Sequence, residues 1–509
     1  MINKVLLFAL AATQLASAAA QKPRLVLTVV VDQFRYDYLT RFRSEYTGGL
    51  SRLLTQGAVC TNANYQHVPA VTAVGHSTVM TGATPSISGI VANDWWDRDD
   101  KVKVSSVSDA KTQLLGGAVL AGSSPRRLLV STIGDELKIA GAGKPKVIGI
   151  SLKDRAAILP SGHMANGAFW FDVKSGNFVS SSYYYDELPG WAKDFNKARQ
   201  VEKYKGVTWQ GHMQPDDLLK LYTELEATPF GNELVEAFTE KALAAEKLGT
   251  REGLTDVLTV SFSSNDYVGH RYGPDSQEVH EIALATDKLL EKLFAAVDKQ
   301  VGANNYLVVM TADHGVPPMV EANLARKMPG GRILPAAVKT AVQAALAAKY
   351  GAGEWVSGNY DLAVYLNQPL IASLKLNLGE VQREAGRAIL ALGHVARVYT
   401  LEQMARGEGL RDPISQKVAN GYHLRRGPDV ELIPDPYWMV ITSVKETTHA
   451  TPYSYDTHVP VIFMGPGIKA GQYAMPVAVN DIAPTLASIL EIETPSGNVG
   501  RVLTEILVN

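Results

Sequence analysis

Four short apolar runs rich in β-branched residues constrain the fold of this 509-residue chain more than any other feature. Runs of this kind are typical of strands that are buried on both faces of a mainly parallel sheet. They are RLVLTVVVD (24–32), PKVIGISLK (145–153), TDVLTVSFSSND (255–266) and NYLVVMTADHG (305–315). We therefore expect an α/β fold that is built around a central, mainly parallel sheet.

Segments with helical patterns lie between these runs. The first, SPRRLLVSTIGDELKIAGAG, begins with Ser124 as an N-cap and Pro125 in the first turn, and it stops at glycines. The second, VHEIALATDKLLEKLFAAVDKQVG, carries an apolar stripe opposite its charges, and the stripe consists of Ile282, Leu289, Leu293 and Val297. Strands that alternate with helices in this way are typical of a layered α/β domain.

We expect residues 21–509 to form one large domain with two insertions. Residues 316–455 mix short strands and helices and are rich in Gly and Pro, which indicates an inserted subdomain. Residues 170–250 contain many Tyr and Trp residues and are expected to form a second insertion or lid. The composition, with 46% hydrophobic and 20% charged residues, is that of an ordinary globular protein and argues against disorder.

The first twenty residues have the pattern of a secretory signal peptide. MINK supplies the positive start, VLLFALAATQLA the apolar stretch, and SAAA a cleavage site after Ala20. We therefore expect a periplasmic or secreted protein with no membrane span after cleavage; an uncleaved anchor is the alternative, although the apolar run is short for a bilayer. Cys60 is the only cysteine, which excludes an internal disulfide, and the net charge of −2 gives no support to a nucleic-acid-binding surface.

Acidic and imidazole side chains follow three of the four predicted strands. Asp32 ends the first run, Asp266 follows the third with His270 four residues later, and Asp313 and His314 end the fourth. Because ligands bind at the carboxyl ends of strands in open α/β sheets, we expect these five side chains at one edge. A single Asp after a strand is more often a turn or N-cap residue, so the coincidence carries the argument. Carboxylates and imidazoles suit zinc, and two such groups suit a two-metal site.

Five further residues are candidates for the same site. His458 precedes a predicted strand rather than following one, so the strand-edge argument does not place it. Lys153 and Arg155 lie two residues apart at the end of a predicted strand, and extended backbone would point both toward an oxyanion; the alternative is a solvated charged turn. Asn93 is a further hydrogen-bond donor or a turn residue. Thr72 is either a helix cap or a nucleophile beside an anion site.

Long stretches around these residues resemble the bacterial threonine-nucleophile phosphate monoesterases (PafA/PhoK type) of the alkaline phosphatase superfamily. The stretches include VVVDQFRYDYL, HVPAVTAVGHSTVMTG, GIVANDWWDR, SLKDRAAILPSGHMANGAFWFD, SFSSNDYVGHRYGPDS, TADHGV, DTHVPVIFMGPG and NDIAPTLASILEI. The resemblance covers nearly the whole chain after the leader. It implies an alkaline-phosphatase-like three-layer sandwich with inserted subdomains, and a single catalytic domain over residues 21–509.

The resemblance also implies two zinc ions and a role for each candidate residue. One ion would be held by Asp266, His270 and His458, and the other by Asp32, Asp313 and His314, with Thr72 between metal and substrate. Asn93, Lys153 and Arg155 match the phosphate-contacting side chains of the family. The implied activity is hydrolysis of small phosphate monoesters to inorganic phosphate through a phosphothreonine; additional structural Ca²⁺ stays open.

Other functions remain to be distinguished. A sulfatase of the same fold would need Cys or Ser in a Cys/Ser-x-Pro-x-Arg setting, whereas this region reads VTAVG. A phosphodiesterase of the same superfamily is the closer alternative, but a diester carries one charge fewer, so the Lys153/Arg155 pair favours monoesters. A phosphoethanolamine transferase would carry membrane helices, and a phosphomutase would be cytoplasmic. A non-enzymatic exported protein that binds phosphate or metal would not need a poised threonine.

Overall fold

The computed structural model describes residues 22–118, 121–409 and 411–508, so the expected signal peptide at 1–20 lies outside these ranges. An eleven-stranded sheet runs through the molecule in the order β22-β2-β21-β14-β1-β13-β8-β9-β10-β6-β7. Its five central strands are parallel: β14 (Tyr306–Thr311), β1 (Leu25–Val31), β13 (Asp256–Phe262), β8 (Val147–Ser151) and β9 (Gly167–Asp172). Mostly antiparallel pairs add β21 (Val461–Met464), β2 (Ala58–Cys60), β22 (Gly471–Tyr473), β10 (Asn177–Ser181), β6 (Ser108–Leu115) and β7 (Ala121–Ser123).

The predicted parallel strands are the centre of this sheet. Every residue of β1, β8, β13 and β14 is buried, as expected for strands covered on both faces. The register places Val30 beside Ser261 on one side and Thr311 on the other, so these strands end nearly level with one another. The polar residues that follow each strand therefore meet at one edge of the sheet.

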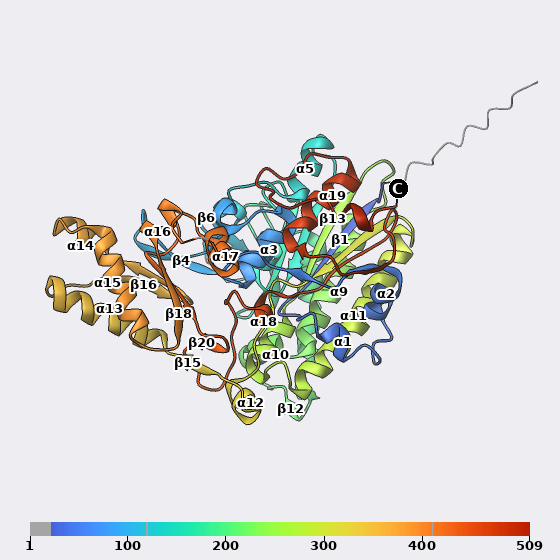
Figure 1. Ribbon diagram of the computed structural model, residues 1–509. Coiled ribbons are helices and arrows are strands. Elements are labelled where there is room, and N and C mark those ends of the chain that lie inside the picture. The colour runs from blue at the N-terminus through green and yellow to red at the C-terminus, as the bar shows by residue number, and fades with distance from the viewer. Residues whose placement is uncertain (1–21, 119–120, 410, 509) are drawn as a thin grey trace, which may run out of the picture.

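Helices cover both faces of the sheet, which gives three layers (Figure 1). One layer consists of α2 (Gly49–Gln56), α9 (Pro229–Glu246) and α11 (Gln277–Val301), and the predicted apolar stripe of α11 is buried. The other consists of α3 (Thr72–Thr81), α5 (Ile133–Ala140), α6 (Asp154–Ile158) and α19 (Ile482–Leu490). The predicted α/β class and three-layer architecture are confirmed. In the described part of the chain, no helix is both long and apolar enough to cross a bilayer.

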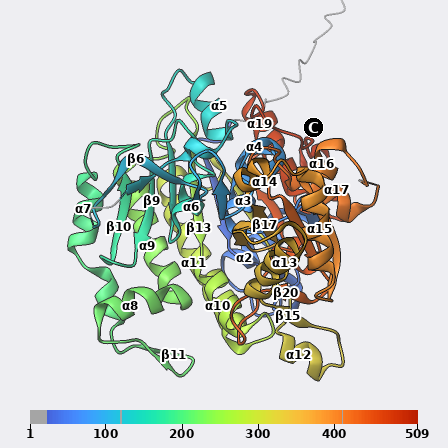
Figure 2. The ribbon, with the colours of Figure 1, turned by 90° about the vertical axis from the view of Figure 1, so that its left-hand side faces the viewer.

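A second, smaller body projects from one end of the sandwich (Figures 1 and 2). It holds the four-stranded sheet β16 (Val356–Tyr360), β17 (Ala363–Leu366), β19 (Val430–Pro434) and β18 (Val395–Thr400), with α13 (Pro335–Tyr350) and α15 (Leu378–Leu390) packed together on it. This body falls within residues 316–455, where we expected an inserted subdomain. Part of residues 170–250, where we expected a second insertion or lid, lies within the main sandwich. Strand β10 pairs within the main sheet, and α9 packs on that sheet.

The helix predicted from Ser124 is divided in two by the structure. Ser124 does act as an N-cap, since its hydroxyl accepts a hydrogen bond from the Arg126 N–H, but the helix it starts ends at Arg127. The α-helix α5 begins at Ile133, where Thr132 and Asp135 form a reciprocal capping box. Two cap signals lie in one segment, and the second, which satisfies two backbone donors, starts the longer helix.

Candidate metal centre

Polar residues after four adjacent strands converge at the carboxyl edge of the sheet. Asp32 follows β1, Lys153 follows β8, Asp313 follows β14, and Asp266 lies in the first turn of α10 (Ser264–Tyr272), directly after β13. The Lys153 ammonium donates hydrogen bonds to Asp32 Oδ2 at 2.9 Å and to Asp266 Oδ2 at 2.6 Å. The structure therefore brings together the strand-end residues that we expected at one edge.

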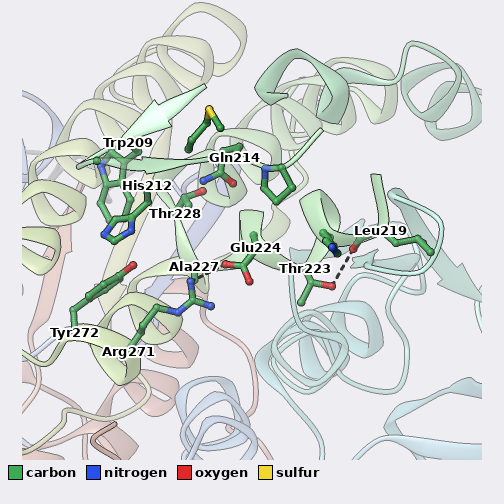
Figure 3. A pocket seen from close by; sticks show the side chains of 14 residues that line it. Trp209, His212, Gln214, Leu219, Thr223, Glu224, Ala227, Thr228, Arg271 and Tyr272 are labelled. Carbon is green, nitrogen blue, oxygen red and sulfur yellow. Dashed lines mark hydrogen bonds and ion pairs between the residues drawn. The ribbon is translucent and has the colours of Figure 1, made fainter. Parts of the chain in front are cut away.

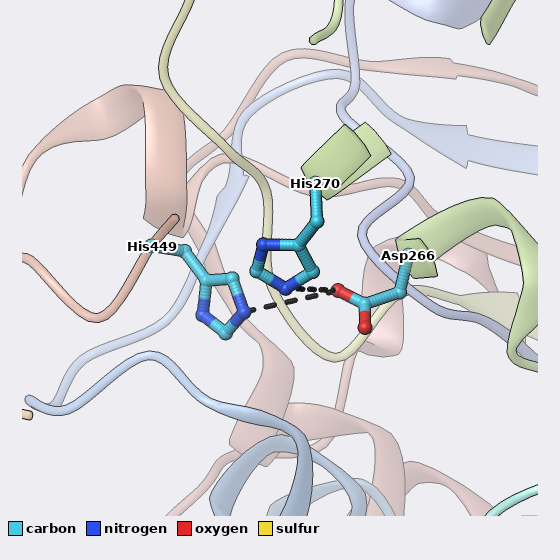
Figure 4. Close-up of side chains that lie close together, drawn as sticks. All are labelled: Asp266, His270 and His449. Atoms are coloured by element: carbon cyan, nitrogen blue, oxygen red, sulfur yellow. Dashed lines mark ion pairs between the residues drawn. The ribbon is translucent and has the colours of Figure 1, made fainter. Parts of the chain in front are cut away.

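One group of potential ligands consists of Asp266, His270 and His449 (Figure 4). The Nε2 atoms of His270 and His449 lie 3.1 and 3.8 Å from Asp266 Oδ1. Their Nδ1 atoms contact the carbonyl oxygens of Thr447 and Ala70, each at 2.7 Å. Because a carbonyl only accepts hydrogen bonds, Nδ1 carries the proton on both rings and both Nε2 atoms are directed at the carboxylate. This arrangement is the one that orients imidazoles for a metal ion.

His458 does not belong to this group, so the expected residue is replaced by His449. His458 follows the short helix α18 (Ser454–Thr457), and its Nε2 contacts the Thr61 carbonyl oxygen at 3.1 Å. Its ring stacks on Tyr36 with centroids 4.6 Å apart. His449 lies nine residues earlier, in an irregular loop, and no strand ends directly before it. In the sequence, residues 448–451 of this loop show only a lone histidine as a signal. The contact with Ala70 that orients His449 is not visible in the sequence.

A second group surrounds the end of β14. His314 Nε2 lies 3.3 Å from Asp313 Oδ2, and both atoms are buried without a hydrogen-bond partner among the described residues. His314 Nδ1 donates to the Gly315 carbonyl at 3.0 Å, which leaves the lone pair on Nε2. Burial lowers the pKa of His314 to about 4, so its ring is neutral near pH 7. Buried polar atoms ordinarily have a hydrogen-bond partner. Two adjacent lone-pair atoms that have none among the described residues therefore fit a bound cation.

The charges around Asp32 and Asp313 differ although both carboxylates are fully buried. Burial favours the neutral acid at Asp32, but the Lys153 ammonium outweighs it and holds the Asp32 pKa below its usual value. At Asp313, burial and the nearby Asp32 charge raise the pKa to about 8. A second positive charge at this group would let Asp313 ionise, which is the electrostatic role of a metal ion.

His76 is a residue of this group that the sequence analysis missed. Its two nitrogens lie 3.4 Å from Asp32 Oδ1 and Asp313 Oδ2, which makes it a candidate ligand by proximity. However, Nδ1 contacts the Thr72 carbonyl oxygen and Nε2 contacts Ser261 Oγ, both at 2.9 Å. Ser261 in turn donates to Asp32 Oδ1 at 2.7 Å. His76 therefore braces the start of α3 and, through Ser261, the Asp32 carboxylate; the available signal was its position four residues after Thr72.

Thr72 is the first residue of α3 and is 2% exposed. The helix cap is the preceding Val71, and the Thr72 hydroxyl has no hydrogen-bond partner in the described part of the chain, so it does not cap the helix. Gly75 brings α3 close to the second group, since a Cβ at this position would lie 2.2 Å from the Asp313 carbonyl oxygen. Thr72 therefore starts a helix that is packed directly on the Asp313 loop.

The expected anion-binding side chains lie around the same edge. Lys153 has extended backbone and is the N-cap of α6, whereas Arg155 lies within that helix, so the predicted extended backbone through Arg155 was wrong. The strand ends two residues earlier, and Asp154 starts the first helical turn. Asn93 Oδ1 accepts a hydrogen bond from the Ala73 N–H at 2.9 Å, which fixes the amide beside Thr72 and leaves its NH₂ group for a ligand.

A cavity of about 740 Å³ lies beside the C-terminal end of α10 (Figure 3). The rings of Trp209, His212 and Tyr272 gather on one of its sides. Arg271 pairs with Glu224 at 2.8 Å across another part of the wall. None of the residues that line it belongs to the two ligand groups, so this cavity is separate from the metal centre.

Comparisons with known proteins agree with this architecture. The family model of type I phosphodiesterases / nucleotide pyrophosphatases matches residues 26–459. The chain is 37% identical to alkaline phosphatase PafA of Elizabethkingia meningoseptica, over 96% of this chain and 95% of that protein. It is 36% identical to alkaline phosphatase PhoV of Synechococcus elongatus, over 96% and 93%. The crystal structure of wild-type PafA superposes with a TM-score of 0.89 over 96% of this chain and all of that one.

Proposed function

This chain belongs to the type I phosphodiesterase / nucleotide pyrophosphatase family of the alkaline phosphatase superfamily, and on that premise we propose that it is an exported, zinc-dependent alkaline phosphatase. It would hydrolyse phosphate monoesters through a phosphothreonine at Thr72. The observation that carries the proposal is the pair of acid–imidazole groups beside the first residue of α3. A protein that only binds phosphate would not need both groups.

The donor atoms fit two zinc ions. Asp266, His270 and His449 would hold one, and Asp32, Asp313 and His314, together with Thr72, would hold the other. Oxygen and imidazole nitrogen are ligands that zinc prefers, and three imidazoles use Nδ1 on a backbone carbonyl, which leaves Nε2 directed at these carboxylates. When bound, zinc supplies positive charge that lowers the pKa of a hydroxyl or water and neutralises the oxygens of the transferring phosphoryl group.

The side chains divide the rest of the reaction between them. Thr72 Oγ1 gives up its proton and attacks phosphorus, a P–O bond to threonine forms, and the bond to the leaving oxygen breaks as that oxygen takes up a proton. Water then attacks phosphorus, the P–O bond to Thr72 breaks, and phosphate leaves as the threonine hydroxyl regains its proton. Lys153 uses two of its three N–H donors on Asp32 and Asp266, which leaves one for a phosphate oxygen. Arg155 and the Asn93 amide hold the remaining equatorial oxygens, where charge is spread in the transition state.

The charges of Lys153 and Arg155 favour monoesters over diesters. A monoester phosphate is a dianion, and two cationic side chains with an amide match its three unsubstituted oxygens. A diester replaces one of these oxygens with a second ester group and loses one charge. The family model also covers phosphodiesterases, so diester hydrolysis is the alternative outcome to measure.

Chelation and a substrate pair test the proposal. We expect purified protein to release nitrophenol from p-nitrophenyl phosphate at least about tenfold faster than from its methyl diester, because the loss of one charge-assisted contact costs at least one factor of ten. EDTA should abolish the activity and zinc should restore it, with two zinc ions per chain by elemental analysis. Faster turnover of the diester would assign a phosphodiesterase. Binding of phosphate without release of nitrophenol would assign a binding protein.

Location and ligands follow from the same proposal. The leader-like residues 1–20 support export with cleavage after Ala20, and the proposed partners are small phosphate monoesters and inorganic phosphate. Mass spectrometry of the N-terminus of protein recovered from periplasm or medium tests this part, because an uncleaved chain would begin at Met1.

A further inference from the structure

Gln33 occupies a backbone position that disfavours its side chain. The Phe34 N–H donates to the Val31 carbonyl at 3.2 Å, which closes a turn directly after β1 with Gln33 as its third residue. Gln33 has a φ of 60°, in the left-handed region where turns ordinarily place Gly or Asn. Since glycine would relieve this strain, the glutamine side chain requires a separate explanation.

The contacts of Gln33 supply that explanation. Its backbone N–H donates to Asp313 Oδ1 at 3.0 Å, in the group with His314. Its side-chain Nε2 donates to Asp266 Oδ1 at 2.6 Å, in the group with His270 and His449. A carboxylate only accepts hydrogen bonds, so the NH₂ end of the amide must face Asp266. One residue that is 2% exposed thus contacts a carboxylate in each group.

The amide is also held in place from the other side. Gln33 Oε1 is buried and has no hydrogen-bond partner among the described residues. It packs against Gly269, where a Cβ would lie 1.8 Å from it, so α10 can only accept the amide because residue 269 has no side chain. Gly269 directly precedes His270. The Gln33 amide is therefore lodged against α10 between two of the candidate ligands.

We propose that Gln33 is a positioning residue that orients one carboxylate in each ligand group and so sets the relation between the two metal sites. The proposal deepens the proposed function, because it rests on metal binding at these groups. Asp266 Oδ1 is the carboxylate atom that faces His270 and His449. Hydrogen bonds to ligand carboxylates of this kind fix their orientation before the metal arrives.

The variant Gln33→Gly separates the side chain from the turn. Glycine keeps the N–H that contacts Asp313 and removes both the backbone strain and the amide on Asp266. We expect the affinity for one of the two zinc ions to fall about 10- to 100-fold, and kcat with it at limiting zinc. The melting temperature of the metal-free protein should stay close to that of the wild type. Zinc affinity is measured by competition with a chromophoric chelator, and stability by calorimetry after dialysis against EDTA.

Lys327→Gly is the matched control, because Lys327 has the same φ of 60° and is exposed. It measures the effect of a glycine at a left-handed position, and its zinc affinity should equal that of the wild type. Gln33→Gly with both zinc affinities within twofold of wild type would overturn the proposal, as would a lower metal-free melting temperature with unchanged zinc affinity. Wild-type protein is titrated in parallel; if it binds no zinc, the proposed function itself has failed.

Discussion

Thr72→Ala is expected to lower kcat for p-nitrophenyl phosphate by a factor of about 10⁴ or more, because loss of a nucleophile removes the covalent route entirely. The fold should survive, since the Thr72 hydroxyl has no hydrogen-bond partner among the described residues and Val71 remains the helix cap. The helix α3 would still bring its N–H groups and Gly75 to the Asp313 loop. Steady-state kinetics, with circular dichroism as the check on folding, measure both expectations.

Two observations separate a nucleophile from a merely structural threonine. Thr72→Ser keeps a hydroxyl at the same Cβ and should retain far more activity than Thr72→Ala. Acid quenching of wild-type turnover should yield a peptide that carries one phosphoryl group on Thr72, and the alanine variant should yield none. Turnover by Thr72→Ala at more than about one tenth of the wild-type kcat would contradict the nucleophile assignment. Even a single oxyanion-hole donor is worth more than a factor of ten in kcat, and a nucleophile should be worth more than that.

The central sheet could be predicted because its strands are buried on both faces. Such strands appear in the sequence as continuous β-branched runs, and all four runs became adjacent parallel strands. The antiparallel strands at the far edge, such as β6 and β7, were not predicted. Their pairing is set by tertiary contacts rather than by a long local pattern. The helix expected from Ser124 failed for a local reason, since a second cap at Thr132 competed with the first.

The strand-edge argument brought Asp32, Asp266 and Asp313 together because position at the end of a parallel strand determines position in space. It could not find His449, which lies in an irregular loop and is oriented by the carbonyl of Ala70, 379 residues away in the chain. It also could not find Gln33, because a glutamine after an aspartate carries no pattern of its own. Residues that act by contacting a ligand's carboxylate are set by three-dimensional packing alone.

His449→Ala is expected to lower kcat/KM by a factor on the order of 100 or more and to remove one zinc ion per chain, because it deletes one of the three proposed ligands in the group with Asp266. His458→Ala is the natural comparison, since it alters the histidine that the family resemblance implied as a ligand. Its ring stacks on Tyr36 and its Nε2 contacts the Thr61 carbonyl oxygen, so its loss should lower the melting temperature by a few degrees and leave two zinc ions in place.

A shorter amide distinguishes ligation from packing at His449. In His449→Asn the side-chain NH₂ can replace Nδ1 as the donor to the Ala70 carbonyl, whereas nothing replaces Nε2 near Asp266 Oδ1. We therefore expect His449→Asn to melt close to the wild type in the metal-free state and still to lose one zinc ion, as His449→Ala does. Retention of two zinc ions by His449→Asn, or their loss in His458→Ala, would return the ligand role to His458. The decisive quantity is zinc per chain, because a damaged loop near Thr72 would lower activity in either case.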